Sequence, residues 1–127
     1  VTDDRRGTAW SSRVVADEAR IAGKTGMAQV LNRVVRNEDV PWEERDHALW
    51  VNFAPYDRPR IAVAVVVEHG GGGSTAAAPI GRDVTLQALY GGTPPLAAYP
   101  ASQRSRIEAQ QDRLERERRA REEGRRA

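Results

Sequence analysis

Four consecutive residues, Gly23, Lys24, Thr25 and Gly26, place a cation and a hydroxyl between two glycines. Lys24 is the only lysine of the chain, whose other permanent positive charges are all arginines. Gly-Lys-Thr is also the end of the phosphate-binding P-loop, which needs Gly-x-x-x-x-Gly-Lys-Thr before a helix. Here Glu18 stands where that motif requires its first glycine, and Gly26 stands where its helix would begin. The spacing therefore excludes a P-loop.

Two interpretations remain for these residues taken alone. One is a tight strand with incidental glycines, and the other is a strand that lies along a ligand. Glycine inside a strand often marks the close approach of another backbone. The segment 21–30 reads as such a strand, interrupted by Gly23 and Gly26.

Two further apolar runs predict the strands that would hold the first one. Residues 48–54 and 61–67 are short, apolar and joined by Pro/Asp turn chemistry at 55–59, which favours an antiparallel hairpin. The run 61–67 is β-branched and apolar on both faces, so we expect it to be central and buried. The polar segment 32–45 is expected to be a connecting excursion with a short helical turn after Pro41.

A helix is predicted after four glycines. Ser74 or Thr75 is expected to cap it, and Gly91 should end it after about Tyr90. Ile80, Val84 and Ala88 form one stripe, with Ala77 beside it, and we expect the helix to pack on the hairpin. The predicted fold class is α+β, with antiparallel strands and a C-terminal helix on one face.

The composition narrows the functional classes. The chain has 127 residues, a formal net charge of +2 and no cysteine, which excludes disulfide scaffolds and Cys-based zinc sites. His47 and His69 are few and far apart in sequence, so no metal site and no cofactor are predicted. No apolar run approaches the roughly 20 residues of a membrane span. Asp46 beside His47 could serve acid–base chemistry, but a role at the start of a strand is the plainer interpretation.

We expect a domain boundary after the helix. Residues 1–92 are predicted to form one folded unit, and 93–127 a Pro-containing extended linker followed by a charged helical or disordered tail. Ile107 and Leu114 are nearly the only large apolar residues of this tail, so a solvated helix is expected. Acidic residues interleave with the arginines, and no nucleic-acid partner is predicted.

Several segments together resemble the class B penicillin-binding proteins of the penicillin-binding protein 2 type. They occur in order over residues 7–105, and they are Ile21–Val30, Arg45–Leu49, Phe53–Tyr56, Pro59–Gly71, Ala77–Asp83 and Pro94–Pro100. These proteins are peptidoglycan D,D-transpeptidases that cross-link stem peptides during cell-wall elongation through a serine acyl-enzyme. The resemblance implies the C-terminal part of a transpeptidase domain with the penicillin-binding-protein/β-lactamase-like fold.

The resemblance also assigns roles to the Lys-Thr-Gly residues. Lys24 would direct its charge at the nucleophile region and the substrate carboxylate, and the Thr25 hydroxyl would donate to that carboxylate. Gly26 would leave room for the substrate backbone, and the backbone N–H of Met27 would stabilise the acyl oxyanion. The family usually has Thr or Ser where this chain has Met27, so a second hydroxyl contact to the carboxylate is missing.

The nucleophile expected of the family is not in this sequence. Its Ser-x-x-Lys motif cannot occur, because the only lysine has Ile21 three residues before it, and no serine has Asn two residues on. We therefore expect a C-terminal fragment that is inactive alone. The resemblance implies stem peptides and β-lactams as ligands, and a membrane glycan polymerase and the elongation machinery as partners of the complete protein. It also implies an inner-membrane protein with its catalytic domain in the periplasm.

Two other classes stay open at this point. A serine D,D-carboxypeptidase or β-lactamase relative would hydrolyse the acyl-enzyme in place of transferring it. A non-catalytic interaction fragment would use Lys24 structurally and bind a partner through its arginine-rich tail.

Overall fold

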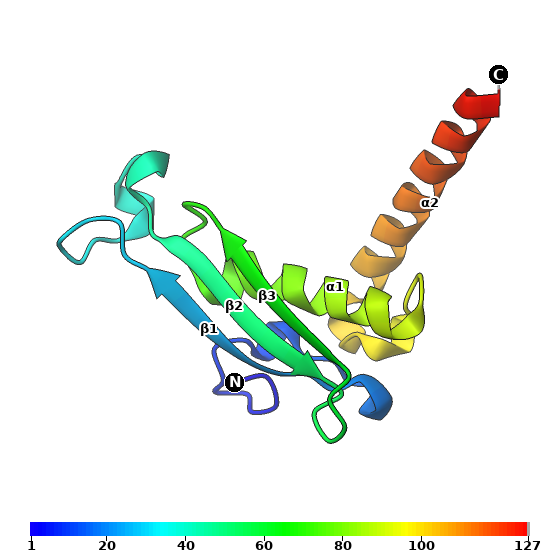
Figure 1. Ribbon diagram of the computed structural model, residues 1–127, viewed down its shortest axis with the longest axis horizontal. Helices are drawn as coiled ribbons and strands as arrows, with labels where there is room; N and C mark the ends of the chain where they lie inside the picture. The colour runs from blue at the N-terminus through cyan, green and yellow to red at the C-terminus, as the bar shows by residue number, and fades with distance from the viewer. Residues whose placement is uncertain (127) are drawn as a thin grey trace.

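The computed structural model describes residues 1–126 and places a small antiparallel sheet beside a helix (Figure 1). The strands β1 (Ala22–Ala28), β2 (His47–Ala54) and β3 (Ile61–Val67) lie in the order β1-β2-β3. Helix α1 (Ala78–Tyr90) packs on one face, and helix α2 (Arg104–Arg126) projects away from it (Figure 1). The predicted α+β class, hairpin and C-terminal helix are confirmed.

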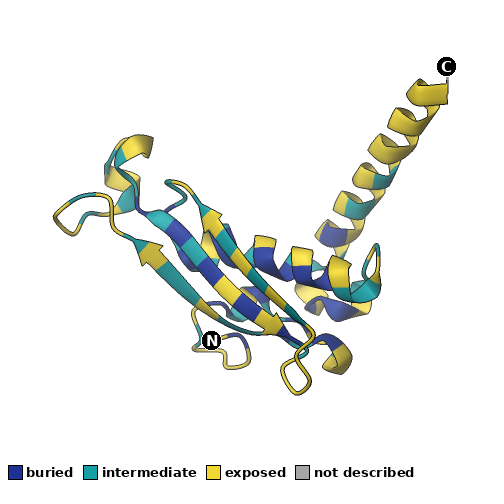
Figure 2. Ribbon diagram, viewed as in Figure 1, coloured by how far each residue is buried: buried dark blue, intermediate teal, exposed yellow. Residues whose placement is uncertain are grey.

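The sheet has one covered face and one open face. Along β2, Ala48, Trp50, Asn52 and Ala54 are buried, whereas Val51 and Phe53 between them are exposed (Figure 2). Side chains alternate between the faces of a strand, so the first set faces α1 and the second faces away. The strand β2 therefore packs against α1 through the alternate residues whose side chains face the core.

The prediction that 61–67 is central and buried was wrong for this chain. Within the described residues β3 pairs with β2 alone, and β2 is the central strand. Ile61, Val63, Val65 and Val67 are half-buried on the α1 side, while Val66 on the other side is 68% exposed. An apolar run shows that both faces of a strand are apolar, but it does not show what covers them.

Helix α1 begins differently from the prediction. A π turn, Gly73–Ala77, precedes it, so Ser74 and Thr75 lie inside that turn and do not cap the helix. The Thr75 hydroxyl donates to the carbonyl of Gly72 at 3.2 Å. The predicted end is confirmed, because Gly91 has a φ of 67° in the left-handed region that glycine adopts readily.

The predicted packing stripe of α1 was also wrong. Ile80 and Val84 are about half exposed, and the buried face consists of Ala78, Gly81, Arg82, Thr85 and Leu86. The polar members of this face are paired, which makes their burial possible. Arg82 donates to Asp83 at 3.0 Å and to Gln103 at 2.8 Å, and Thr85 belongs to the network described below.

The segments before β1 and after α1 pack together. The N–H of Val15 donates to the carbonyl of Ala98 at 2.9 Å, and the Gln103 amide donates to the carbonyl of Ser11 at 2.6 Å. Ala98 and Tyr99 are buried, so the segment predicted as an extended linker forms short 3-10 turns that cover the core. The division into 1–92 and 93–127 stays a prediction.

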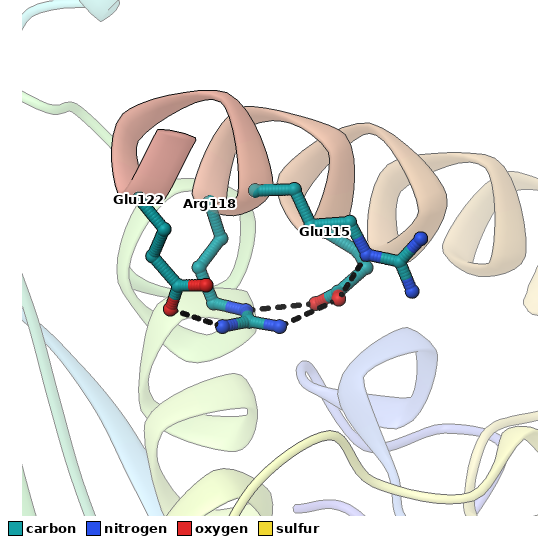
Figure 3. Close-up of polar contacts among 4 residues, drawn as sticks. Glu115, Arg118 and Glu122 are labelled. Carbon is teal, nitrogen blue, oxygen red and sulfur yellow. Dashed lines mark hydrogen bonds and ion pairs between the residues drawn. The ribbon is translucent and has the colours of Figure 1, made fainter. Parts of the chain in front are cut away.

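The arginine-rich segment is the helix α2, which is anchored at its first turns and exposed beyond them (Figure 2). Ile107 is only 4% exposed and joins the core, whereas Leu114, two turns later, is 51% exposed. Further along, Arg118 bridges Glu115 and Glu122 within one helix face (Figure 3). Arg118 and Arg119 lower the pKa of Glu115 to about 2, so this ladder is charged at neutral pH.

We predict that the two large apolar residues of α2 differ sharply in their contribution to stability. Ile107→Ala should lower the free energy of unfolding by roughly 2–4 kcal/mol, because a buried side chain leaves a cavity. Leu114→Ala, the matched control on the same helix, should cost less than about 1 kcal/mol. Urea unfolding of the two variants measures the difference, and equal costs would show that α2 does not dock through Ile107.

Candidate functional site

The strand that carries Lys24 and Thr25 has a free edge. β1 pairs with β2 in antiparallel register from Ala22 opposite Phe53 to Ala28 opposite His47. Within the described residues no strand pairs with the other edge of β1. An edge of this kind offers backbone N–H and C=O groups to which an extended peptide can add as a further strand.

Lys24 lies on the open face of the sheet. Its register partner is Val51, whose side chain points away from α1, and Lys24 is itself exposed. Its Nζ donates to the carbonyl of the adjacent Thr25 at 2.8 Å, which holds the ammonium beside its own strand. A shallow, mostly apolar hollow of about 600 Å³ adjoins it, lined by Gly23, Val51, Phe53, Ala62 and Ala64 among others.

Thr25 points to the opposite face of the strand, and there it meets a residue that the sequence did not indicate. Its hydroxyl lies 3.2 Å from the hydroxyl of Thr8, a hydrogen bond in which either oxygen could donate. The two residues are 17 positions apart, and nothing in the polar segment around Thr8 predicted this contact. Thr8 therefore holds the Thr25 hydroxyl at a defined position beside the strand.

Gly26 and Met27 complete the motif in opposite orientations. The Met27 side chain is 59% exposed on the same face as Thr25, opposite Ala48. Gly26 lies opposite Leu49, whose Cβ is 3.4 Å from the position that a Cβ of residue 26 would occupy. The structure thus keeps all four residues of the predicted site on one strand, with Lys24 and Thr25 on its two faces.

A buried polar network ties β2 to α1 directly behind this strand. The indole Nε1 of Trp50 donates to Oδ1 of Asn52 at 2.7 Å, and the Asn52 amide donates to the Thr85 hydroxyl at 2.9 Å. Thr85 in turn donates to the carbonyl of Gly81 at 2.7 Å. Each of the three donor atoms in this network has a protein acceptor, so the network fixes the rotamers of three buried side chains.

Asp46 and His47 serve the start of β2. The backbone N–H of Val30 donates to the Asp46 carboxylate at 3.2 Å, and Asn37 Oδ1 accepts from the Asp46 N–H at 2.8 Å. His47 Nδ1 accepts from the backbone N–H of His69 at 2.9 Å, and the two imidazoles lie 4.6 Å apart. These contacts join the end of β1 and the start of β2 to the glycine turn, Gly70–Gly73. They agree with the interpretation that Asp46 and His47 have a structural role at the start of a strand.

The fold brings His47 and His69 together although they are 22 residues apart in the sequence. Even so, residues 1–126 contain no group of three or more His, Cys, Asp or Glu placed to hold a metal ion. The same part of the chain has no helix long and apolar enough to cross a membrane.

Comparison with known proteins decides the family. Residues 1–86 match the family model described as the penicillin binding protein transpeptidase domain. The chain belongs to this family. The resemblance that the Lys-Thr-Gly segment and its following strands indicated is confirmed.

Individual relatives cover the same region. The chain is 44% identical over 69 residues to the peptidoglycan D,D-transpeptidase MrdA of Haemophilus influenzae, and 40% identical over 77 residues to the peptidoglycan D,D-transpeptidase PbpA of Mycobacterium tuberculosis. These matches cover 51% and 57% of this chain, but only 11% and 14% of the relatives. The chain therefore spans a small part of the curated proteins that it matches.

A solved structure supports the fold. A chain in the complex between penicillin-binding protein PBP2 and MreC from Helicobacter pylori superposes with a TM-score of 0.54 at 32% identity. The match covers 70% of this chain and 15% of that one. The antiparallel sheet with its C-terminal helix is thus the corresponding part of a transpeptidase domain.

We predict that the network behind the strand is costly to interrupt. Thr85→Val keeps the volume but leaves the Asn52 amide without its acceptor in the core, so the free energy of unfolding should fall by about 1–3 kcal/mol. Thr75→Val is the matched control, because the Thr75 hydroxyl is exposed and water can replace its contact. Thermal or urea unfolding measures both, and a neutral Thr85→Val variant would mean that the network does not hold α1 on the sheet.

Proposed function

We propose that this chain supplies the Lys-Thr-Gly strand of a peptidoglycan D,D-transpeptidase that cross-links stem peptides through a serine acyl-enzyme. The observation that carries the proposal is the free edge of β1, which presents Gly23–Gly26 within a region matched to the transpeptidase family. The serine nucleophile would come from a part of the enzyme outside this sequence.

The free edge suits the substrate, which is an extended peptide. A stem peptide would lie along β1 as an added strand, and Gly26 would give it clearance. Lys24 would direct its ammonium towards the reacting serine and the terminal carboxylate, and Thr25, oriented by Thr8, would donate to that carboxylate. The Met27 backbone N–H would donate to the oxyanion that forms on the attacked carbonyl.

The reaction proceeds in two transfers. The serine oxygen attacks the carbonyl of the penultimate D-Ala, its proton passes to the leaving amine, and the terminal D-Ala departs. An amine of a neighbouring stem peptide then attacks the acyl-enzyme, and the serine oxygen regains a proton as the new peptide bond forms. β-Lactams would enter the same site, because they carry a strained amide and a carboxylate in comparable positions.

The family and the solved complex support a proposal for the partners and the location. The Helicobacter pylori PBP2 was determined bound to MreC, which supports a place in a cell-elongation assembly for this chain as well. We extend this to a membrane glycan polymerase as a partner, and to an inner-membrane protein with a periplasmic catalytic domain. The relatives are named transpeptidases, and this favours transfer over hydrolysis by a carboxypeptidase or β-lactamase.

We predict that Lys24 serves acylation and contributes little to folding. In a complete transpeptidase whose C-terminal part is this chain, Lys24→Ala should slow acylation by a fluorescent penicillin about 10²–10³-fold, the usual effect of removing one preorganised electrostatic contact. Its melting temperature should stay nearly the same, because Lys24 is exposed.

Arg58→Ala is the matched control, since it removes an exposed cation from the β2–β3 turn, outside the Lys-Thr-Gly strand. The 127-residue chain alone should not be acylated. Equal acylation rates for Lys24→Ala and Arg58→Ala would overturn the proposed role of this lysine.

A further inference from the structure

The glycine turn that leads into α1 touches the backbone of β1, the strand that carries the Lys-Thr-Gly motif and is called the motif strand below. Gly73 is buried, and a Cβ built on it would lie 2.6 Å from the carbonyl oxygen and 3.0 Å from the nitrogen of Gly26. It would also lie 2.5 Å from the carbonyl oxygen of Leu49 on β2. Since Cβ atoms essentially never approach other atoms this closely, any side chain at residue 73 requires one of these backbones to move.

The turn cannot easily be the part that moves. Gly71 has a φ of 84°, and its N–H donates to the carbonyl of Asp46 at 2.9 Å. A Cβ on Gly70 would lie 2.7 Å from the Val67 side chain. Contacts with Asp46 and Val67 thus hold the turn before it reaches Gly73. Since β1 has one free edge, it is less constrained than the turn, and we expect β1 to move when a side chain is added at residue 73.

A second contact of the same kind reaches the other end of the motif. The indole of Trp50 lies between Gly23 of β1 and Gly81 of α1, and a Cβ on either glycine would lie 2.3 Å from a ring atom. The network through Asn52 and Thr85 prevents the indole from turning away. Helix α1 and its preceding turn therefore contact the motif strand at Gly26 directly and at Gly23 through Trp50.

We propose that Gly73 is a positioning residue for the Lys-Thr-Gly strand, with Gly81 acting on the same strand through Trp50. The proposal rests on the proposed function, because the peptide bond between Gly26 and Met27 is the one whose N–H would face the oxyanion. Hydrogen bonds to an oxyanion need donors about 2.7–3.1 Å from the developing charge, so a shift of a few tenths of an ångström matters. Gly73 sets this distance from the face of the sheet opposite Lys24.

The test combines two readouts on Gly73→Ala, with Gly124→Ala as the matched control because a Cβ there meets nothing within 4 Å. In the 127-residue chain, amide hydrogen exchange should accelerate at least tenfold at Gly26, whose N–H faces β2 if that of Met27 faces the free edge, and should stay unchanged in β3. In a complete transpeptidase carrying this chain, the maximal acylation rate should fall about 10- to 100-fold, while the affinity of the first penicillin complex changes less than threefold.

The outcomes separate the alternatives. Wild-type acylation and exchange for Gly73→Ala would overturn the proposal, and so would a uniform acceleration of exchange over all strands, which indicates a general structural role. If Gly73→Ala does not fold, Gly81→Ala decides, with faster exchange expected at the Lys24 amide and no acceleration in β3. A complete wild-type protein that penicillin does not acylate would refute the proposed function, whereas the exchange measurement would still decide the positioning.

Discussion

The indole of Trp50 lies between Gly23 of β1 and Gly81 of α1 and positions both elements. Because Gly23 on β1 and Gly81 on α1 have no side chains, the large indole ring fits in the space between them. The indole N–H would be an unpaired buried donor without Asn52, and the Asn52 amide would be unpaired without Thr85. Sheet and helix are therefore joined by packing and by hydrogen bonds at the same residue.

This arrangement explains how a strand with a free edge can be held in place. Edge strands are paired on one side only, and they are usually the more mobile members of a sheet. β1 gains its second constraint from behind, where the turn at Gly73 contacts its backbone and α1 reaches it through the Trp50 indole. Within residues 1–126 the free edge and the Lys24 face are open, and these are the surfaces that the proposed substrate needs.

The sequence predicted the strands well because their signals are local. The short apolar runs 48–54 and 61–67 and the turn between them at 55–59 were enough to predict the β2–β3 hairpin, and Gly91 marked the end of α1. Long-range features were not predictable in this way. The central position expected for 61–67 depends on which strands pair with it, and an apolar run carries no information about that.

In the candidate site, too, the local features could be predicted from the sequence and the long-range contacts could not. Lys24 to Met27 were found from their types and spacing, because the motif is contiguous. Thr8, Gly73 and Gly81 contact it from distant segments, and their own surroundings in the sequence look like a polar segment, a glycine turn and an ordinary helix. The helix face was mispredicted because hydrophobicity favoured Ile80 and Val84, whereas burial follows Gly81 and Thr85, whose smallness and hydrogen bonding are needed next to Trp50.

If Trp50 couples α1 to the Lys-Thr-Gly strand, hydrogen exchange of its indole N–H should follow the opening of that strand. Trp42 is half exposed and provides an internal reference in the same NMR spectrum. We expect the Trp50 indole to exchange only when β1 opens, with the same dependence on denaturant as the β1 amides that donate to β2. A Trp50 indole that exchanges as fast as that of Trp42, while those β1 amides stay protected, would contradict it.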